Sequence, residues 1–266
     1  MKLSYLGLLL PLACSGKDDS TGGGDESDTD TDSDTDTDTD TDTDKVPPCK
    51  GTFTDARDGR AYAQAVLMAG GVPGDDCWMA ENLDYGDFLP SKKGDQTDNK
   101  LPEKYCYDDD EANCATLGGL YQWGELMAYG PSDNTARGAT QGLCPIGWHL
   151  PTDEEWKKLE LALGMQIDDI SEEGWRGKAV SPQLMMGAAS GYDATLTGWY
   201  DGEFNDHKEA AKYWLATLTN PSEPDDSDGW DRELENPEKN SSVGRFSESL
   251  DEGLSARCVR DAIVEK

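Results

Sequence analysis

The sequence predicts a single α+β domain that is rich in loops and follows a long acidic segment. Residues 27–44 are nine consecutive Ser/Thr-Asp dipeptides without an apolar residue. Most of the 29 glycines come after this segment, where short apolar stretches of strand-like and helix-like spacing are separated by turns. This pattern favours an α+β architecture over a helical bundle or repeated βαβ units.

The charge of the chain excludes several function classes. It has 55 Asp and Glu residues against 23 Lys and Arg residues, a formal net charge of −32, and two histidines. Nucleic-acid affinity comes largely from Lys and Arg side chains that displace counterions, so we expect no nucleic-acid partner. Two histidines also give little support to histidine-dependent catalysis or to a multi-histidine metal site.

The acidic segment is predicted to be a tether. Residues 1–44 hold 13 acidic and 2 basic side chains, and such a chain cannot bury enough surface to offset its ordering entropy. We therefore expect residues 14–48 to be disordered and extended, and residues 49–266 to form the folded domain. An alternative role is weak collection of Ca²⁺, although tight calcium sites need ligands that converge from a fixed loop.

The N-terminus predicts export and a lipid anchor. Residues 1–13 contain one lysine and an apolar run that is too short to span a bilayer but suits a signal-peptide core. Leu12-Ala13-Cys14 resembles the lipobox of bacterial lipoproteins. This resemblance implies cleavage before Cys14 and acylation of its thiol, and Ser15 in the next position implies forwarding to the outer membrane, facing the periplasm or the cell surface. The alternative is an ordinary secretory signal with a chance cysteine.

The remaining cysteines predict disulfides. They form an even set in a chain bound for an oxidising compartment. Fifteen pairings of six cysteines are possible, and proximity favours Cys106 with Cys114. We then pair Cys144 with Cys258 and Cys49 with Cys77. A metal site is the rival interpretation, but the chain has no Cys-x-x-Cys pair.

Several local patterns predict individual elements. Residues 53–57 and 60–66, on either side of Asp58-Gly59, predict a β-hairpin with a type I′ turn. Trp123, Leu126 and Met127 have helical spacing and predict a short helix that ends near residue 130. Residues 191–192, 213–217 and 254–259 are predicted to be short strands.

The clearest predicted element is a helix after Pro151. Thr152 and Glu155 have the spacing of a capping box, and two acidic residues in the first turn favour the helix dipole. Gly164 can end the helix. Its predicted apolar face consists of Trp156, Leu159, Ala162 and Leu163.

A set of ordered motifs covers nearly all of residues 52–261. The early motifs are Thr52-Phe53-Thr54-Asp55 and Cys77-Trp78-Met79-Ala80-Glu81-Asn82-Leu83, and the late ones include Tyr213-Trp214, Ser241-Ser242-Val243-Gly244-Arg245 and Ala256-Arg257-Cys258-Val259-Arg260-Asp261. Between them lie Leu120-Tyr121-Gln122-Trp123 and Cys144-Pro145-Ile146-Gly147-Trp148-His149-Leu150-Pro151-Thr152. In this order the motifs resemble the Fibrobacter succinogenes major paralogous domain family.

Two blocks are also similar to the formylglycine-generating, sulfatase-modifying family. They are the Trp-His-Leu-Pro-Thr block at residues 148–152 with Glu155 and Trp156, and the closing Arg-Cys-Val-Arg at residues 257–260. This resemblance implies a C-type-lectin-like α+β domain with long binding loops. The oxidases of that family bind copper through two nearby cysteines, whereas Cys258 stands alone here, so we expect no enzyme activity and no cofactor.

The tryptophans and histidines of the motifs are interpreted as structural. Large aromatic side chains at such positions usually fill a core. We expect His149 to be a hydrogen-bonded structural residue and His207 to lie in an exposed acidic stretch, without a catalytic role for either. The five tryptophans assigned to the core are Trp78, Trp123, Trp148, Trp156 and Trp214.

Binding residues are expected in the loops, where scaffolded recognition usually resides. Trp199 and Tyr200 form one aromatic candidate site, and Trp230, within the acidic stretch at residues 224–233, forms another. Aromatic faces beside carboxylates suit sugar rings. Clustered carboxylates could instead hold calcium, and the ligands would be Asp226, Asp228 and Asp231. The alternative interpretation is an acidic loop that simply faces water.

Three functions remain open at this point. The favoured one is a non-enzymatic, membrane-anchored lipoprotein that binds a glycan or surface polymer, an expectation that rests on analogy with lectin-like folds. The second is a module that docks another envelope protein. The third, least favoured, is a copper oxidase of the formylglycine-generating type.

Overall fold

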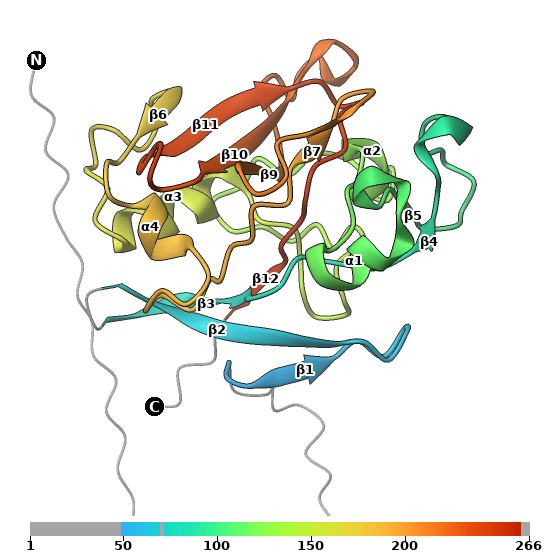
Figure 1. The fold of residues 1–266 in the computed structure, drawn as a ribbon. Helices are drawn as coiled ribbons and strands as arrows, with labels where there is room; N and C mark the ends of the chain where they lie inside the picture. Colours follow the sequence, from blue (N-terminus) through green and yellow to red (C-terminus); the bar gives the residue numbers. More distant parts are fainter. Residues whose placement is uncertain (1–48, 70–71, 262–266) are drawn as a thin grey trace, which may run out of the picture. The chain divides into compact units, whose positions relative to one another are not determined.

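The computed structural model describes residues 49–69 and 72–261 (Figure 1). The chain divides into two units, Met1–Lys45 and Val46–Lys266, and the described residues all belong to the second. The predicted signal peptide, the predicted acylation site at Cys14 and the whole predicted tether at residues 14–48 therefore lie outside the described residues. Within the described ranges, no helix has the length and apolar character needed to cross a membrane.

Four antiparallel strands form the first sheet, in the order β1-β2-β3-β12. Their bounds are β1 Thr52–Thr54, β2 Ala61–Ala69, β3 Val72–Met79 and β12 Val259–Asp261. The predicted hairpin is confirmed, but its two-residue type I′ turn is wrong. Thr54 pairs with Ala61, and within this longer connection φ is positive at Gly59 and not at Asp58. The Asp55 carboxylate accepts the Arg57 backbone N–H and guanidinium, which holds the wider turn.

A second antiparallel sheet has the order β6-β11-β10-β9. Its strands are β6 Gly174–Arg176, β9 Ala210–Leu218, β10 Gly229–Glu235 and β11 Val243–Glu248. All nine residues of β9 are buried, which confirms the strand predicted at residues 213–217. Two small sheets pair β4 Asp87–Phe88 with β5 Glu103–Lys104 and β7 Trp199–Tyr200 with β8 Phe204–Asn205.

The helices are few and short, so strands dominate the α+β architecture. They are α1 Glu111–Leu117, α2 Trp123–Leu126, α3 Asp153–Ala162 and α4 Ser181–Leu184, with 3-10 turns η1 Ser91–Lys93, η2 Tyr107–Asp109 and η3 Pro224–Asp226. Figure 1 shows the first sheet on one side of the domain and the second on the other, with helices between and beside them.

Helix α3 confirms the predicted capping box. The Thr152 hydroxyl accepts the Glu155 backbone N–H, while the Glu155 carboxylate accepts the Thr152 N–H. Ala162 is exposed, so its assignment to the apolar face is wrong, because its position in the last turn points away from the core. Helix α2 is confirmed but ends at Leu126, before the predicted end near residue 130.

The C-terminal segment joins the two sheets. Ser255 exchanges backbone hydrogen bonds with Lys212 and Trp214 on β9, and Ala256 and Cys258 accept N–H groups beside β3. The strand predicted at residues 254–259 is thus a set of single bridges followed by β12. The strand predicted at residues 191–192 is wrong. There the Tyr192 carbonyl accepts a hydrogen bond from the Arg257 guanidinium instead of pairing with a strand.

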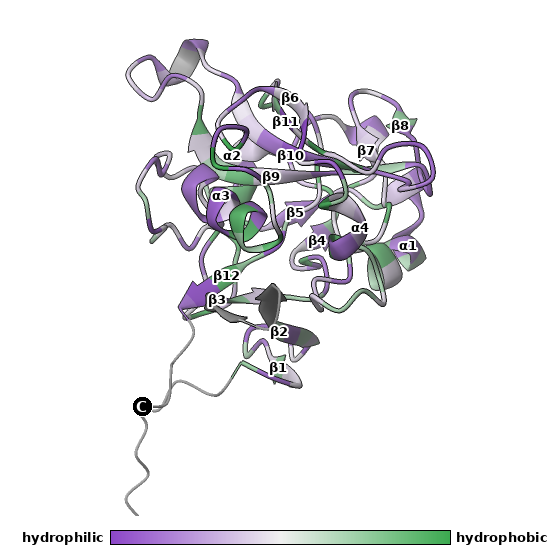
Figure 2. Cartoon of the chain, turned by 90° about the vertical axis from the view of Figure 1, so that its left-hand side faces the viewer, coloured by the Kyte–Doolittle hydropathy of each residue, from purple (hydrophilic) through white to green (hydrophobic). Residues whose placement is uncertain are grey.

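Two hydrophobic clusters make up the core. The first gathers around Trp214 with Trp123 and Trp148, and the second gathers around Trp156 with Trp78, which confirms the core role of all five tryptophans. His149 bonds to Glu155 through Nε2 at 2.9 Å, as the structural interpretation predicted. Figure 2 shows hydrophobic and hydrophilic stretches alternating over short distances along the ribbon, as expected for short elements.

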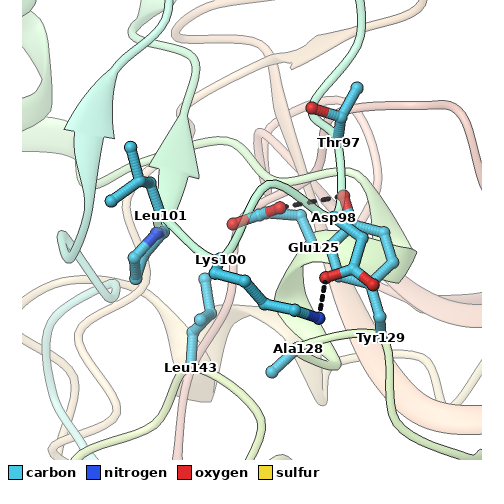
Figure 3. A pocket seen from close by; sticks show the side chains of 9 residues that line it. Thr97, Asp98, Lys100, Leu101, Glu125, Ala128, Tyr129 and Leu143 are labelled. Atoms are coloured by element: carbon cyan, nitrogen blue, oxygen red, sulfur yellow. Dashed lines mark hydrogen bonds and ion pairs between the residues drawn. The ribbon is translucent and has the colours of Figure 1, made fainter.

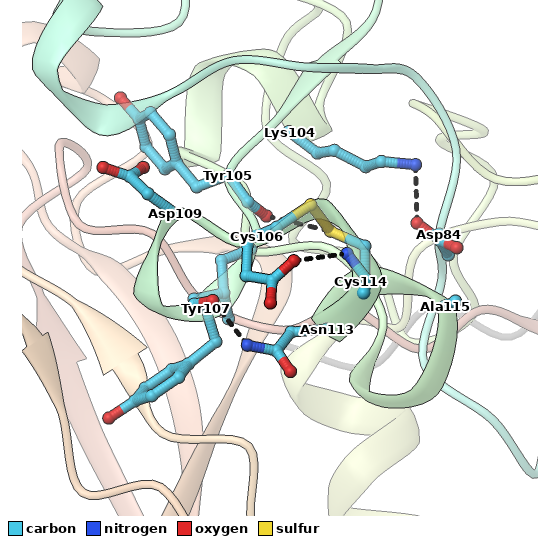
Figure 4. Close-up of a disulfide and its surroundings, with 12 residues drawn as sticks. Asp84, Lys104, Tyr105, Cys106, Tyr107, Asp109, Asn113, Cys114 and Ala115 are labelled. Carbon is cyan, nitrogen blue, oxygen red and sulfur yellow. Dashed lines mark hydrogen bonds and ion pairs between the residues drawn. A yellow bond between two sulfur atoms is a disulfide. The ribbon is translucent and has the colours of Figure 1, made fainter.

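Three disulfides tie the loops to this core. They join Cys49 to Cys77, Cys106 to Cys114 and Cys144 to Cys258, the same pairs that the sequence analysis proposed. The Cys106–Cys114 bond closes the loop that contains η2, where the Asn113 side chain also donates to the Tyr107 carbonyl (Figure 4). The Cys144–Cys258 bond fixes the C-terminal segment across 114 residues of sequence.

Candidate functional site

Two adjoining cavities beside α2 form a groove. Their volumes are about 220 Å³ and 360 Å³, and they share Glu125 and Tyr129. We call them together the Tyr129 groove. Besides these two residues, side chains that line the groove include Asp95, Gln96, Asp98, Lys100, Leu101, Gln122, Trp123, Leu218, Pro224, Leu250 and Asp251.

Tyr129 stands between the two cavities on a turn of unusual backbone conformation. Ala128 and Tyr129 both have positive φ, at 49° and 55°. Non-glycine residues rarely adopt this conformation, and such strain is common at functional sites. A Cβ atom at Gly124 would lie 3.3 Å from the Tyr129 ring, so glycine at that position lets the ring lie close to α2. The turn thus presents an aromatic ring that is 41% exposed.

The buried side chain of Glu125 holds this ring in position. It is only 3% exposed, and its carboxylate accepts the Glu103 backbone N–H at 2.9 Å. The same carboxylate accepts the Tyr129 hydroxyl at 2.9 Å (Figure 3). Burial raises the pKa of Glu125 above its ordinary value. At the mouth of the first cavity, Lys100 pairs with Asp98 at 2.6 Å. Leu101, which is 60% exposed, adds an apolar surface next to them.

The wall of the second cavity is held by amide hydrogen bonds. Gln96 and Gln122 each accept the other's backbone N–H through the side-chain oxygen. The Gln122 side-chain nitrogen donates to the Asp95 carboxylate at 3.1 Å and to the Asp251 carbonyl at 2.7 Å. Trp123 adds an aromatic edge, and its indole N–H donates to the Leu215 carbonyl. These contacts place the polar groups of the groove before any ligand arrives.

The lining combines aromatic rings with carboxylates, amides and one ammonium group. Tyrosine and tryptophan rings provide apolar faces, and carboxylates and amides provide hydrogen-bond acceptors and donors. No histidine or cysteine is among the residues that line the two cavities. The arrangement suits a neutral ligand with many hydroxyl groups.

The sequence analysis had placed the aromatic candidates elsewhere. Trp199 packs against the first core cluster, and the Lys212 ammonium lies 4.4 Å from the centre of its ring. Tyr200 contacts the rings of Tyr105 and Phe204. These contacts make Trp199 and Tyr200 half-buried parts of the β7–β8 hairpin.

Trp230 lies on the other side of the second sheet. Strand alternation places Lys212, Asp231 and Glu233 on one face, which we call the Lys212 face, and Trp230, Arg232 and Arg245 on the opposite Arg232 face. The Arg245 guanidinium stacks 3.5 Å from the Trp230 ring centre. The rings of the two aromatic candidate sites are therefore each packed against a cation, on different faces of the second sheet.

The three predicted calcium ligands are not brought together either. Asp226 and Asp228 are exposed, whereas Asp231 is fully buried on the Lys212 face. Across the described ranges, no group of three or more His, Cys, Asp or Glu side chains is placed to hold a metal ion. The prediction failed because Asp228 ends the loop and Asp231 already belongs to β10, whose pleat turns its side chain inward.

The Tyr129 groove was missed because its residues had been interpreted as helix and core. Leu120-Tyr121-Gln122-Trp123 was interpreted as a family-like motif, Trp123 was assigned to the short helix and the core, and Tyr129 received no role. A usable signal was present in Tyr129-Gly130-Pro131, an aromatic residue at the end of a helix next to a strong turn signal. Pro224, at the start of the predicted acidic loop, does line the groove, so that loop contributes to its rim.

Comparison with known proteins gives one match. The model of the Fibrobacter succinogenes major domain matches residues 73–260, which is more than half of the chain. No curated protein and no solved structure matches the chain.

Proposed function

The chain belongs to the Fibrobacter succinogenes major domain family, and from the geometry of its groove we propose that it is a non-enzymatic binding module for a glycan or a glycan-like surface polymer. The ligand lies in the Tyr129 groove, with a sugar ring against the exposed face of Tyr129 and its hydroxyl groups bonded to Gln122 and the neighbouring carboxylates.

The main observation in support of this proposal is an exposed aromatic ring, Tyr129, that is held in place between two cavities. The buried Glu125 carboxylate fixes the Tyr129 hydroxyl, and the strained turn fixes the backbone. A ligand therefore does not have to order this ring, which lowers the entropic cost of binding. The groove also extends past the ring in both directions, as a polymer site requires.

The rest of the proposal places the module outside the cytoplasm. Acylation of Cys14 would hold it in the outer membrane, and the Ser/Thr-Asp segment would carry the domain away from the lipid surface. The three disulfides support an oxidising compartment. The C-type-lectin-like relation is part of the proposal, and the mixture of two small sheets with short helices and long loops supports it. Membrane fractionation of Cys14→Ala tests the anchor, and unchanged membrane association would contradict it.

A titration with defined oligosaccharides tests the ligand class. We would measure binding of cellohexaose, xylohexaose, chitohexaose and mannohexaose to the full chain by calorimetry at pH 6. At least one should bind saturably, and Tyr129→Ala should weaken it tenfold or more, equivalent to about 1.4 kcal/mol.

The matched control is Trp175→Ala. Trp175 is 40% exposed, nearly the same as Tyr129, but does not line the groove. This variant should bind as tightly as the unmodified chain. Absence of binding by any of the four saccharides, or equal losses in the two variants, would contradict the proposal.

A further inference from the structure

The Lys212 face of the second sheet gathers four carboxyl groups around one ammonium. Asp231, Glu233, Glu248 and Glu252 form what we call the acidic cluster. The Lys212 ammonium lies 2.5 Å from Glu248 and 3.7 Å from Glu252. Glu233 lies directly opposite Lys212 in the register of β10 and β9, and Asp231 is the next residue on the same face.

This cluster has fewer hydrogen-bond donors than its carboxylates need. Asp231 is fully buried, and while its Oδ1 accepts the Phe246 N–H, its Oδ2 has no hydrogen-bond partner. Oε2 of Glu252 is likewise buried without a hydrogen bond. Burial, together with the neighbouring Glu248 charge, raises the pKa of Asp231 to about 8 and that of Glu252 to about 7. Burial raises the pKa of Glu233 to about 7 as well.

A single loop connects the cluster to the Tyr129 groove. Residues 249–253 follow directly after Glu248, and Leu250 and Asp251 in this loop line the second cavity. The Leu250 carbonyl accepts the Trp123 N–H at 3.0 Å, and the Asp251 carbonyl accepts the Gln122 side chain at 2.7 Å. Glu252 comes next and belongs to the cluster. The loop therefore touches the groove on one side and the cluster on the other.

We infer that the acidic cluster is a proton-controlled latch, which holds loop 249–253 against the groove when it is protonated and releases the loop when its carboxyl groups ionise. The latch would regulate the same groove that the proposed function assigns to the ligand. The movement of the loop does not depend on that assignment, and only its effect on ligand binding rests on the proposed function.

On ionisation of the cluster, loop 249–253 moves first, because the other carboxyl groups of the cluster are held by strands. Asp231 and Glu233 belong to β10, which is paired on both sides, whereas Glu248 ends β11 and Glu252 lies in the loop. Further charges adjoin the cluster. Asp201 faces Glu252, and Glu235 and Asp206 face Glu233, so they add to the repulsion, while Arg232 attracts Asp231 from the opposite face. When the protons leave to solvent, Lys212 alone cannot balance the carboxylates.

The Trp123 amide reports directly on the latch. We would measure protection factors for amide hydrogen exchange by NMR on the full chain between pH 5 and pH 8. Protection of the Trp123 N–H should fall with rising pH by up to about tenfold per unit per released proton, between the ordinary glutamate pKa of 4.5 and the raised value of about 7. The Gln122 N–H, which donates to Gln96 away from the loop, should keep its protection.

Two charge-matched variants complete the test. Glu252→Gln should reduce the pH dependence at Trp123, whereas Asp226→Asn, at an exposed carboxylate outside the cluster, should leave it unchanged. Constant protection of Trp123 in the unmodified chain, or the same loss in Glu252→Gln, would overturn the latch. If cellohexaose and the other three saccharides bind neither at pH 5 nor at pH 8, the proposed function fails. The protection of the Trp123 N–H still decides whether the latch exists.

Discussion

The two faces of the second sheet solve the problem of buried charge in opposite ways. Asp231, Arg232 and Glu233 are consecutive in β10, yet the pleat sends Arg232 to one face and the two acidic residues to the other. On the Arg232 face every carboxylate is bonded to several cations. On the Lys212 face four carboxyl groups share one ammonium. The contrast shows that burial raises the pKa of a carboxyl group on either face, and that its hydrogen-bond donors and neighbouring cations decide whether the net shift is upward or downward.

The Arg232 face is a network around two carboxylates of α3. Asp153 accepts Arg232 at 2.8 Å and Arg245 at 2.9 Å, and Glu160 accepts Arg232 at 2.7 Å and Arg176 at 2.9 Å. Burial opposes ionisation of Asp153, but the hydrogen bonds from Arg245 and the charge of Arg232 outweigh it and hold its pKa below the ordinary value. Burial and the neighbouring guanidinium groups lower the pKa of Arg176 to about 10.

These opposite shifts predict opposite responses to pH. A carboxylate with a lowered pKa stabilises the fold above its unfolded pKa, and this contribution is lost as pH falls. A carboxyl group with a raised pKa favours the fold while protonated, and this contribution is lost as pH rises through the folded value. Asp153 therefore stabilises the fold at neutral and alkaline pH and loses this contribution in acid, whereas the acidic cluster stabilises the fold at mildly acidic pH and loses its contribution as pH rises. Stability should be greatest just above the ordinary carboxyl pKa.

Removing the charge of Asp153 should have the largest effect. Asp153→Asn leaves Arg232 and Arg245 buried with one charge partner fewer, and breaking a buried pair in this way costs about 3–5 kcal/mol. Urea unfolding at pH 7 measures the loss. Glu154→Gln is the control, because this neighbouring carboxylate is half exposed and, among the described residues, has its one ion pair with Lys157, so its loss should stay below about 1 kcal/mol. Equal losses would mean that the Arg232 face does not depend on its charges.

Removing the charge of Asp231 should have an effect of the opposite sign. Asp231→Asn keeps the acceptor for the Phe246 N–H but cannot ionise, so it should stabilise the fold at pH 8 by more than about 1.4 kcal/mol, the equivalent of one pKa unit. At pH 3 the gain should vanish, because Asp231 is then protonated in the unfolded state as well as in the folded state. Thermal unfolding at both pH values measures the difference. A gain that does not depend on pH would contradict the assignment, and the exposed Asp228→Asn should show no gain at either pH.

The elements that could be predicted from sequence were those set by local chemistry. The α3 capping box needs only Thr152 and Glu155 three residues apart, and the first hairpin needs only Gly59 in a turn. Residues 191–192 were wrongly predicted as a strand because Tyr192 is held by Arg257, which lies 65 residues later in the sequence. Such long-range partners leave no periodic signal.

The candidate site shows the same limit, because its geometry depends on partners that are distant in the sequence. Aromatic residues near acidic residues predicted binding sites at Trp199 and Trp230, but these rings pack against Lys212 and Arg245 of the same chain. Tyr129, which does remain exposed, owes its position to a turn of positive φ and to the buried Glu125. Neither feature is visible in composition or spacing.

A smaller effect is expected at Lys157, which sharpens the comparison between the two faces. Its ammonium pairs with Asp153 at 2.9 Å and with Glu154 at 2.8 Å. Asp153 retains two arginines when Lys157 is lost, so Lys157→Met should cost only about 0.5 kcal/mol, as is usual for pairs one helical turn apart. Urea unfolding at pH 7 measures this loss. If the loss in Lys157→Met approached the loss in Asp153→Asn, the two arginines alone would not balance the charge of Asp153. The Arg232 face would then depend on each of its cations, as the Lys212 face depends on its single ammonium.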